Sequence, residues 1–233
     1  MKKILPLLIA CLSIPLANVY AESAGGGFSL GSTRVIYNAK DTQATFTVNN
    51  TAKDSPFLTQ SWITPYTGKD KPPFVITPPL YRQDQGSNTL RIRKMSDSLS
   101  KDRESAFWIN VKAIPSQSKK TIDENSISFA YVLRIKMFYR PSELNVDVTD
   151  AYKNLTFSQV GSSIKVQNPT PYFITFNKLS VNGVDLKEIN HMVPPKGEWD
   201  YEIPRGTVAK KIEYKTINDF GGVTPLQVKN VTK

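Results

Sequence analysis

Short stretches in which apolar and polar residues alternate dominate most of the chain. Apolar residues occupy every second position in 44–48 (Ala, Phe, Val) and again in 107–111 (Phe, Ile, Val). Successive side chains of a strand point to opposite faces, so a period of two predicts half-buried β-strands. Such segments recur about every 8–12 residues with Pro, Gly, Asn and Asp between them, which is typical of β-sandwiches. No segment has the apolar spacing of a long helix, and the 16 prolines argue against one.

The longest alternating run spans residues 127–137. Its odd-numbered residues are all large and apolar, whereas its even-numbered residues are Ser, Ala, Val, Arg and Lys. The pattern predicts one strand of about 11 residues, near the upper end of usual lengths. At a sheet edge, such a strand can pair with another protein, and its alternate side chains can fill that protein's pockets. A central strand of the protein's own sandwich has the same pattern, so the alternation alone leaves both interpretations open.

The alternation breaks at residues 140–143 (Arg-Pro-Ser-Glu), and a second set of short strands follows. We therefore predict an N-terminal domain at residues 22–142 and a C-terminal domain at residues 143–233. Both have the size of immunoglobulin-like sandwiches. The predicted fold class is all-β, with two immunoglobulin-like β-sandwich domains.

Residues 1–21 have the composition of an export signal. Two lysines precede a mostly apolar stretch, and Val19 and Ala21 occupy the small-residue positions of a cleavage site, so we expect cleavage after Ala21. The segment that ends at Cys11 (Leu-Ile-Ala-Cys) also resembles a lipoprotein box. The apolar run before Cys11 is short and the apolar stretch continues beyond it, which favours an ordinary signal peptide. No later segment has the roughly 18 consecutive apolar residues of a membrane-spanning helix.

Composition excludes several kinds of chemistry. Cys11 is the only cysteine, so the mature chain has no thiol nucleophile, cysteine zinc site or disulfide. His191 is the only histidine, and no Gly-x-Ser-x-Gly motif accompanies it. The acidic pairs at 123–124 and at Asp147 and Asp150 lie in polar, turn-like stretches that are typical of solvated loops rather than of a glycosidase site. We therefore predict no catalytic residue, metal or cofactor.

The net charge is +10, and it falls to +8 when the two signal-peptide lysines are removed. An exported protein rarely meets nucleic acid, so the charge favours an acidic protein partner. Solubility alone is the other explanation of this charge.

Eight short motifs occur in order along the mature chain, and they are Ser-Thr-Arg-Val-Ile-Tyr (32–37), Ile-Thr-Pro-Pro-Leu (76–80), Asn-Thr-Leu-Arg-Ile (88–92), Asp-Arg-Glu-Ser (102–105), Asn-Val-Lys-Ala-Ile-Pro (110–115), Ile-Lys-Met-Phe-Tyr-Arg-Pro (135–141), Asn-Pro-Thr-Pro-Tyr (168–172) and Thr-Ile-Asn-Asp-Phe-Gly (216–221). With these motifs, the chain resembles the periplasmic chaperones of the chaperone–usher pilus pathway over essentially its whole mature length. The segment before the long strand is short and lacks cysteines, which resembles the subclass that assembles rod-like pili.

The resemblance implies a boomerang arrangement of the two domains with a cleft between them. Arg34 and Lys136 match the two basic cleft residues that bind the C-terminal carboxylate of a pilus subunit. Cations in a partly dry cleft form strong charge-assisted hydrogen bonds, so this role is physically reasonable.

The long strand then matches the donor strand, whose side chains complete a subunit that lacks its own last strand. The donor side chains implied here are Ile127, Phe129, Tyr131 and Leu133. A smaller aliphatic residue is usual at the position of Tyr131, so the chain departs from the family pattern there.

Three further residues, Glu104, Arg140 and Asp219, match an ionic network that fixes the angle between the domains. The bond before Pro78 matches a cis peptide bond of the family.

The function implied is that of an ATP-independent periplasmic chaperone, not an enzyme. Its expected partners are pilus subunits (pilins and a tip adhesin) and an outer-membrane usher, with no nucleic acid. A pilus subunit or adhesin is the first alternative, and the missing disulfide argues against it. A secreted hydrolase is the second, and the missing acid–base constellation argues against that. The sequence leaves open whether the free protein self-associates through its exposed strand.

Overall fold

The computed structural model describes residues 27–116 and 129–232. Three predicted features lie outside these ranges: the signal peptide with Cys11, the acidic pair at 123–124, and Ile127, which is an expected donor residue. In the part of the chain that is described, no helix is long and apolar enough to cross a membrane.

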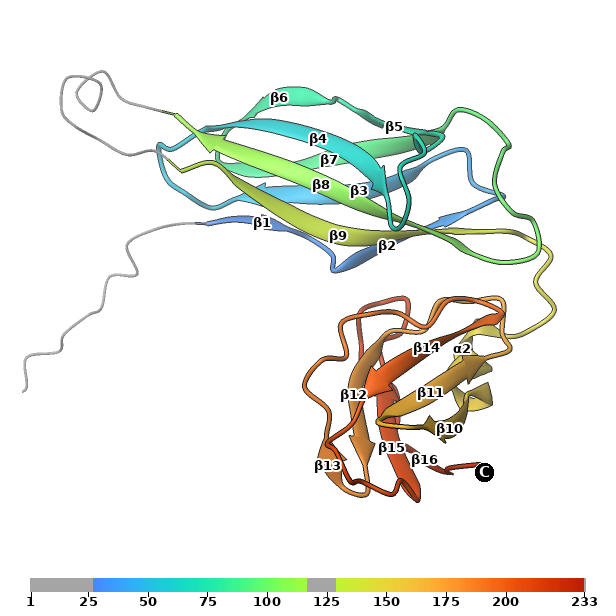
Figure 1. Ribbon diagram of the computed structural model, residues 1–233. Helices are drawn as coiled ribbons and strands as arrows, with labels where there is room; N and C mark the ends of the chain where they lie inside the picture. Colours follow the sequence, from blue (N-terminus) through green and yellow to red (C-terminus); the bar gives the residue numbers. More distant parts are fainter. Residues whose placement is uncertain (1–26, 117–128, 233) are drawn as a thin grey trace, which may run out of the picture.

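Two sheets form the N-terminal domain (Figure 1). Its strands are β1 (Phe28–Leu30), β2 (Arg34–Asn38), β3 (Ala44–Asn50), β4 (Phe57–Pro65), β5 (Phe74–Thr77), β6 (Leu80–Gln83), β7 (Gly86–Lys94), β8 (Ser105–Pro115) and β9 (Tyr131–Arg140). One sheet has the order β1-β3-β7-β5 and the other the order β2-β9-β8-β4-β6. The chain therefore changes sheet between β1 and β2.

The C-terminal domain is a second, smaller sandwich. Its elements are α2 (Val148–Ala151), the 3₁₀ helix η1 (Tyr152–Asn154), β10 (Thr156–Val160), β11 (Ser163–Asn168), β12 (Phe176–Val181), β13 (Val184–Asp185), β14 (Gly197–Glu202), β15 (Lys211–Thr216) and β16 (Gln227–Asn230). Its sheets have the orders β10-β11-β14 and β13-β12-β15-β16.

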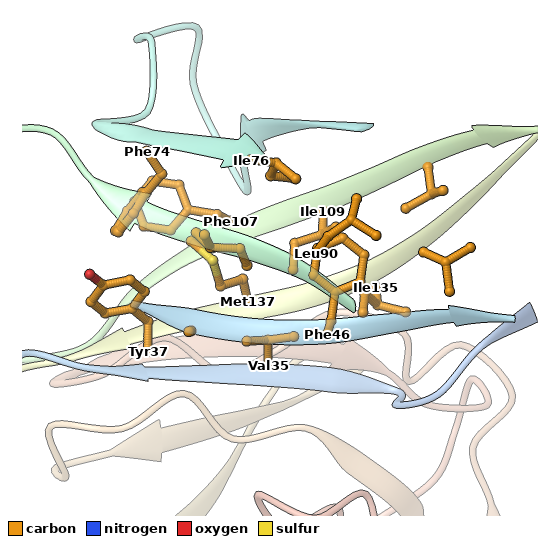
Figure 2. Packing of buried hydrophobic residues seen from close by; sticks show 14 of the residues in the cluster. Val35, Tyr37, Phe46, Phe74, Ile76, Leu90, Phe107, Ile109, Ile135 and Met137 are labelled. Atoms are coloured by element: carbon orange, nitrogen blue, oxygen red, sulfur yellow. The ribbon is translucent and has the colours of Figure 1, made fainter. Parts of the chain in front are cut away.

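Each sandwich has its own apolar core, and the alternation in the sequence produces it. Phe107, Ile109 and Val111 of β8 point inward and pack against Leu90 and Met137 in the first core, part of which Figure 2 shows. A fully buried side chain of this size contributes about 1.5–3 kcal/mol before entropy costs. A separate cluster with residues from 151 to 214 fills the second sandwich. The predicted all-β fold with two immunoglobulin-like sandwiches is confirmed, whereas the boundary after residue 142 stays a prediction.

The long strand differs from its predicted extent. The sequence predicted 127–137, but β9 begins at Tyr131, and Phe129 and Ala130 are not in a strand. Alternation describes which face a side chain takes, but a strand also needs a hydrogen-bonded neighbour. The ladder between β8 and β9 ends at the pair Ala113 and Tyr131, so the pattern continues beyond the last pairing.

β9 has different neighbours along its length. One part of it is a central strand and the other part is an edge strand, so each interpretation of the long strand holds for one part. Residues 136–139 lie between β8 and the parallel strand β2, and Arg140 pairs with β2. Residues 131–135 pair with β8 alone among the described residues. This free edge of β9, residues 131–135, is the first component of the candidate site.

Direct contacts join the two domains. The Glu104 N–H donates to the Pro171 carbonyl over 2.9 Å, and Lys196 forms a 2.8 Å ion pair with Asp102. At Gly221, φ is +81°, and a Cβ there would lie 2.5 Å from the Thr33 hydroxyl oxygen of the other domain. The close approach and the left-handed backbone both require glycine.

Candidate functional site

The inward face of β9 belongs to the domain core at one end of the strand and reaches solvent at the other. Ile135 and Met137 are buried, Leu133 is half-buried against the same core, and Tyr131 is exposed. Phe129, just before the strand, is 75% exposed. The core therefore ends in a row of large apolar side chains beside the free edge of β9.

Tyr131 is only partly available to a partner. Its ring lies 6.1 Å from that of Phe28 and 6.3 Å from that of Phe57, both in edge-to-face geometry. Burial raises the pKa of its phenol, although a hydrogen bond with the Phe28 backbone opposes this shift. The ring of Tyr131 therefore packs against its own domain.

Arg34 and Lys136 lie at the point where β2 joins β9. They are directly paired in the parallel register, and both are half-buried. Arg34 Nη1 donates to the Ile217 carbonyl of the other domain over 3.2 Å, and the guanidinium lies 5.8 Å from the Phe138 ring centre. The Arg34 Nε is buried and has no hydrogen-bond partner in the described structure.

Neither of these two cations forms a salt bridge with a described residue. Burial, together with the nearby positive charge of Arg34, lowers the pKa of Lys136 to about 8. Burial also lowers the pKa of Arg34, against the opposing charges of Asp219 and Glu104. Half-buried cations without counter-ions favour an anion from another molecule, because a carboxylate would offset their desolvation.

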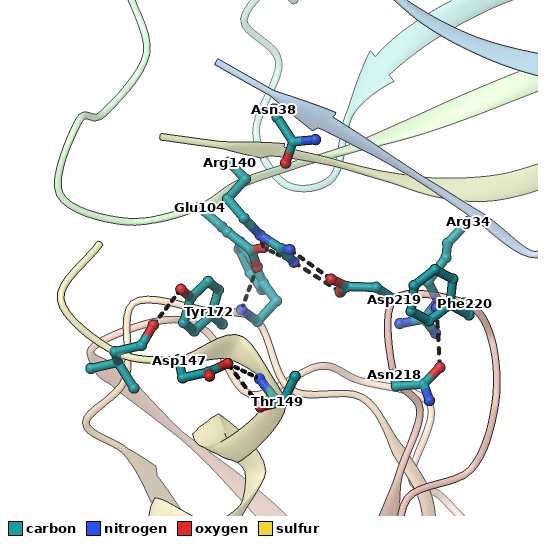
Figure 3. Close-up of polar contacts among 12 residues, drawn as sticks. Arg34, Asn38, Glu104, Arg140, Asp147, Thr149, Tyr172, Asn218, Asp219 and Phe220 are labelled. Atoms are coloured by element: carbon teal, nitrogen blue, oxygen red, sulfur yellow. Dashed lines mark hydrogen bonds and ion pairs between the residues drawn. The ribbon is translucent and has the colours of Figure 1, made fainter. Parts of the chain in front are cut away.

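Glu104, Arg140 and Asp219 lie together between the domains (Figure 3). Arg140 bonds Glu104 over 2.8 and 2.9 Å through two nitrogens and Asp219 over 2.6 and 2.8 Å. The second Glu104 oxygen accepts the Phe173 N–H over 2.8 Å. Burial raises the pKa of Glu104 to about 7, while Arg140 and the Phe173 N–H oppose that rise. The fork of Arg140 thus holds one carboxylate from each domain.

An inter-domain cavity of about 260 Å³ opens beside this network. Arg34 and Phe138 line it from the N-terminal domain, and Phe173, Ile217 and Phe220 line it from the other. Phe220 is 97% exposed, and Figure 3 shows its ring alongside Arg34.

Several site features had no clear signal in the sequence. The Tyr66 ring contacts the rings of Trp108 and Phe173 at 5.3 and 6.2 Å, and its hydroxyl accepts the Met192 N–H over 3.4 Å. These residues come from distant strands and loops, so only the packing of the two domains brings them together. Phe220 and Asp102 belong to motifs that were identified in the sequence. Those motifs gave no indication of the contacts that the two residues make between the domains.

The remaining predicted features are the peptide bond before Pro78, the single histidine and the expected absence of a metal site. The Thr77–Pro78 peptide bond is cis. His191 stacks on Trp199 with ring centres 4.3 Å apart and is exposed. In the described ranges, no cluster of three His, Cys, Asp or Glu side chains could hold a metal.

These observations define a two-domain β-sandwich protein with an open strand edge that ends at two cations, neither of which has a salt-bridge partner in the described part of the chain. Two family models match the chain. One, described as pili and flagellar-assembly chaperone, PapD N-terminal domain, matches residues 27–145, and the other, pili assembly chaperone PapD, C-terminal domain, matches residues 150–228. The chain belongs to this family of pilus-assembly chaperones, whose members are chaperones and not enzymes.

Individual relatives agree with this assignment. The chain is 43% identical over 217 residues to the chaperone protein LpfB of Salmonella typhimurium, covering 92% of this chain and 93% of the relative. It is 40% identical over 220 residues to the chaperone protein FimC of Escherichia coli K12, covering 94% and 90%.

Solved structures give the same result. A structure of the Salmonella enterica SafA pilin in complex with the SafB chaperone matches with a TM-score of 0.79 and 29% identity, over 88% of this chain and 96% of that one. The periplasmic chaperone SfaE matches with a TM-score of 0.72 and 41% identity, over 86% and 97%.

Proposed function

We propose that this protein binds pilus subunits along the free edge of β9, anchors their C-terminal carboxylate on Arg34 and Lys136, and delivers them to an outer-membrane usher without ATP. One observation carries the proposal. Within residues 27–116 and 129–232, the edge of residues 131–135 is unpaired and ends at two half-buried cations that form no salt bridge. An exposed strand edge binds a strand, and the cations require an anion.

The geometry selects the direction of the bound strand. β2 occupies the edge of β9 from Lys136 onward, so a partner strand on that edge has to end there. If the partner runs parallel to β9, its C-terminal carboxylate arrives at the cations. An antiparallel partner would bring its upstream main chain toward β2, where it has no edge to pair with. Parallel pairing therefore accounts for both the edge and the charge.

The apolar face of β9 supplies the second part of the interaction. A subunit without its last strand exposes its core, and the side chains of Phe129, Tyr131 and Leu133 would complete that core. Because the same face continues into the core of the N-terminal domain, the two cores would join. Ile127 has the same expected role.

The inter-domain network has a supporting role in this proposal. Arg140 binds Glu104 and Asp219 of different domains, so it fixes how the C-terminal domain faces Arg34. A buried network of this kind specifies geometry more than it adds stability.

We further propose that the chain is exported to the periplasm and that its signal peptide is removed after Ala21. SfaE, which is 41% identical, is a periplasmic chaperone. A protein that binds subunits before assembly would have to meet them there.

Co-purification from periplasmic extracts tests the proposed function. The tagged wild-type protein should carry along a small subunit, and Arg34→Ala and Lys136→Ala should each lose it while they keep the far-UV circular dichroism of a folded β-protein. Arg91→Ala is the matched control, because Arg91 is an exposed cation on β7 in the other sheet. Retention of the subunit by both cleft variants would refute the anchor.

A further inference from the structure

We infer that the inter-domain cavity beside Arg34 is a subsite for the side chain of the partner's last residue, and that it selects an uncharged apolar or aromatic side chain. The inference rests on the proposed function, because the anchored carboxylate is what brings that residue to Arg34.

The cavity lies directly beyond the anchor along β9. Lys136, Phe138 and Arg140 take the same face of the strand, and of these Phe138 and Arg140 line the cavity. The cavity begins beside the anchor, because Arg34, the direct partner of Lys136, also lines it. The partner's main chain cannot continue past this point, because β2 holds the edge. The side chain of the last residue can still enter the cavity.

The size and lining of the cavity fit one apolar side chain. Its volume of about 260 Å³ is below the roughly 300–1,000 Å³ of small-molecule sites. Phe138 forms one wall, and Phe173, Ile174 and Val223 of the C-terminal domain form others. Such walls favour apolar or aromatic groups.

The charges around the cavity explain the selectivity. Arg140 is bound by Glu104 and Asp219, whereas Arg34 forms no salt bridge with a described residue. A terminal carboxylate would neutralise Arg34. Both acidic residues that line the cavity, Glu104 and Asp219, are already bound by Arg140, so a lysine or arginine side chain there would lose its hydration without gaining an uncommitted carboxylate of this chain.

Phe220 stands at the mouth of the cavity in a fixed position. The Asn218 side chain accepts the N–H groups of Phe220 and Gly222 over 3.1 and 2.9 Å, which holds the turn. The ring nevertheless contributes nothing to its own core, since it is 97% exposed. A large apolar side chain held in solvent by a well-bonded turn is a ready contact for a bound partner.

Peptide binding to the full mature chain tests this subsite. The probes are strand-length peptides of alternating apolar and polar residues that differ only in the last residue, which is Phe, Leu, Gly or Lys. Each is prepared with a free carboxylate and with an amide. Val223→Trp would fill the cavity, and Val228→Trp on β16 is its matched control, because the two valines are 50% and 51% exposed. Phe220→Ala is a second variant. Because the Phe220 side chain is exposed, we expect this variant to fold, so a change in its peptide affinity would not be explained by misfolding.

Wild-type protein should bind the Phe and Leu peptides about tenfold more tightly than the Gly peptide, and the Lys peptide no better than Gly. Val223→Trp should abolish this difference, Phe220→Ala should reduce it, and Val228→Trp should keep it. Equal affinities for all four endings, together with weaker binding of the amides, would refute the subsite and leave the anchor intact. A difference that persists in Val223→Trp would also refute it. Loss of the carboxylate dependence, or no binding by any peptide, would refute the anchor and the subsite together.

Discussion

Replacing Lys136 by methionine should make the free protein more stable while it removes half of the proposed anchor. Lys136 is half-buried next to Arg34 and has no acidic partner among the described residues. Its positive charge therefore destabilises the folded protein. Methionine keeps a long unbranched stem in the same space and carries no charge.

The size of the effect follows from the pKa. A pKa lowered from 10.5 to about 8 corresponds to a cost of up to about 3 kcal/mol for holding the proton at neutral pH. Partial contact with solvent reduces that cost, so we expect Lys136→Met to raise the free energy of unfolding by about 1–2 kcal/mol at pH 7. Between pH 8 and 10.5 the folded protein binds fewer protons at this site than the unfolded chain does. The wild type therefore gains stability in that window, and the difference from Lys136→Met should shrink.

Urea denaturation measures this difference. In a Trp199→Phe background, the remaining tryptophans, Trp62 and Trp108, both report on the N-terminal domain. Lys112→Met is the control, because Lys112 lies on the same outer face four residues along β8 from the partner of Lys136 and is also half-buried. If Lys136→Met is no more stable than Lys112→Met, or if the difference does not change with pH, the argument from desolvation is wrong.

Three further predictions concern the cleft. Arg140→Ala should cost about 3–5 kcal/mol of unfolding free energy, because it leaves the buried Glu104 and the half-buried Asp219 without their counter-ion. Lys196→Ala, at the exposed inter-domain pair, should cost less than about 1 kcal/mol. Similar losses of the two variants in urea denaturation would contradict a special role for the buried network. Gly221→Ala should lower the free energy of unfolding by about 1 kcal/mol more than Gly206→Ala. Both glycines have positive φ, but only at Gly221 would a Cβ lie 2.5 Å from a hydroxyl oxygen. Equal losses of the two variants would show that the inter-domain contact relaxes freely. The affinity for a free-carboxylate peptide should fall about tenfold between pH 7 and pH 9, because the Lys136 ammonium loses its proton in this range. Lys136→Arg should remove this pH dependence. If fluorescence titrations show that the wild-type affinity does not change with pH, Lys136 is excluded from the anchor.

Much of the fold could be predicted from the sequence because it follows from local alternation. The segments 44–48 and 107–111 have a period of two and lie in β3 and β8, with their apolar residues buried. The start of β9 could not be predicted in this way. Phe129 continues the pattern, but the pairing with β8 stops at Tyr131, and pairing depends on a distant part of the chain.

The site divides in the same way. Arg34 and Lys136 could be marked from motifs, and the parallel register of β2 and β9 sets them side by side. Contacts between the domains, such as that of Tyr66 with Phe173, depend on how two separately folded sandwiches meet. No local pattern encodes that arrangement, so the cavity beside Arg34 becomes visible only in three dimensions.

The end of the free edge at β2 has a consequence for any strand that docks there. If the last residue is anchored as proposed, the register of the strand is counted backward from that residue. One residue added at that tail would turn every upstream side chain to the opposite face and bury its polar set in place of its apolar set. Residues added before the docked strand would leave the match untouched, so under this proposal partner sequences can vary in length upstream of that strand but not within it or at its tail.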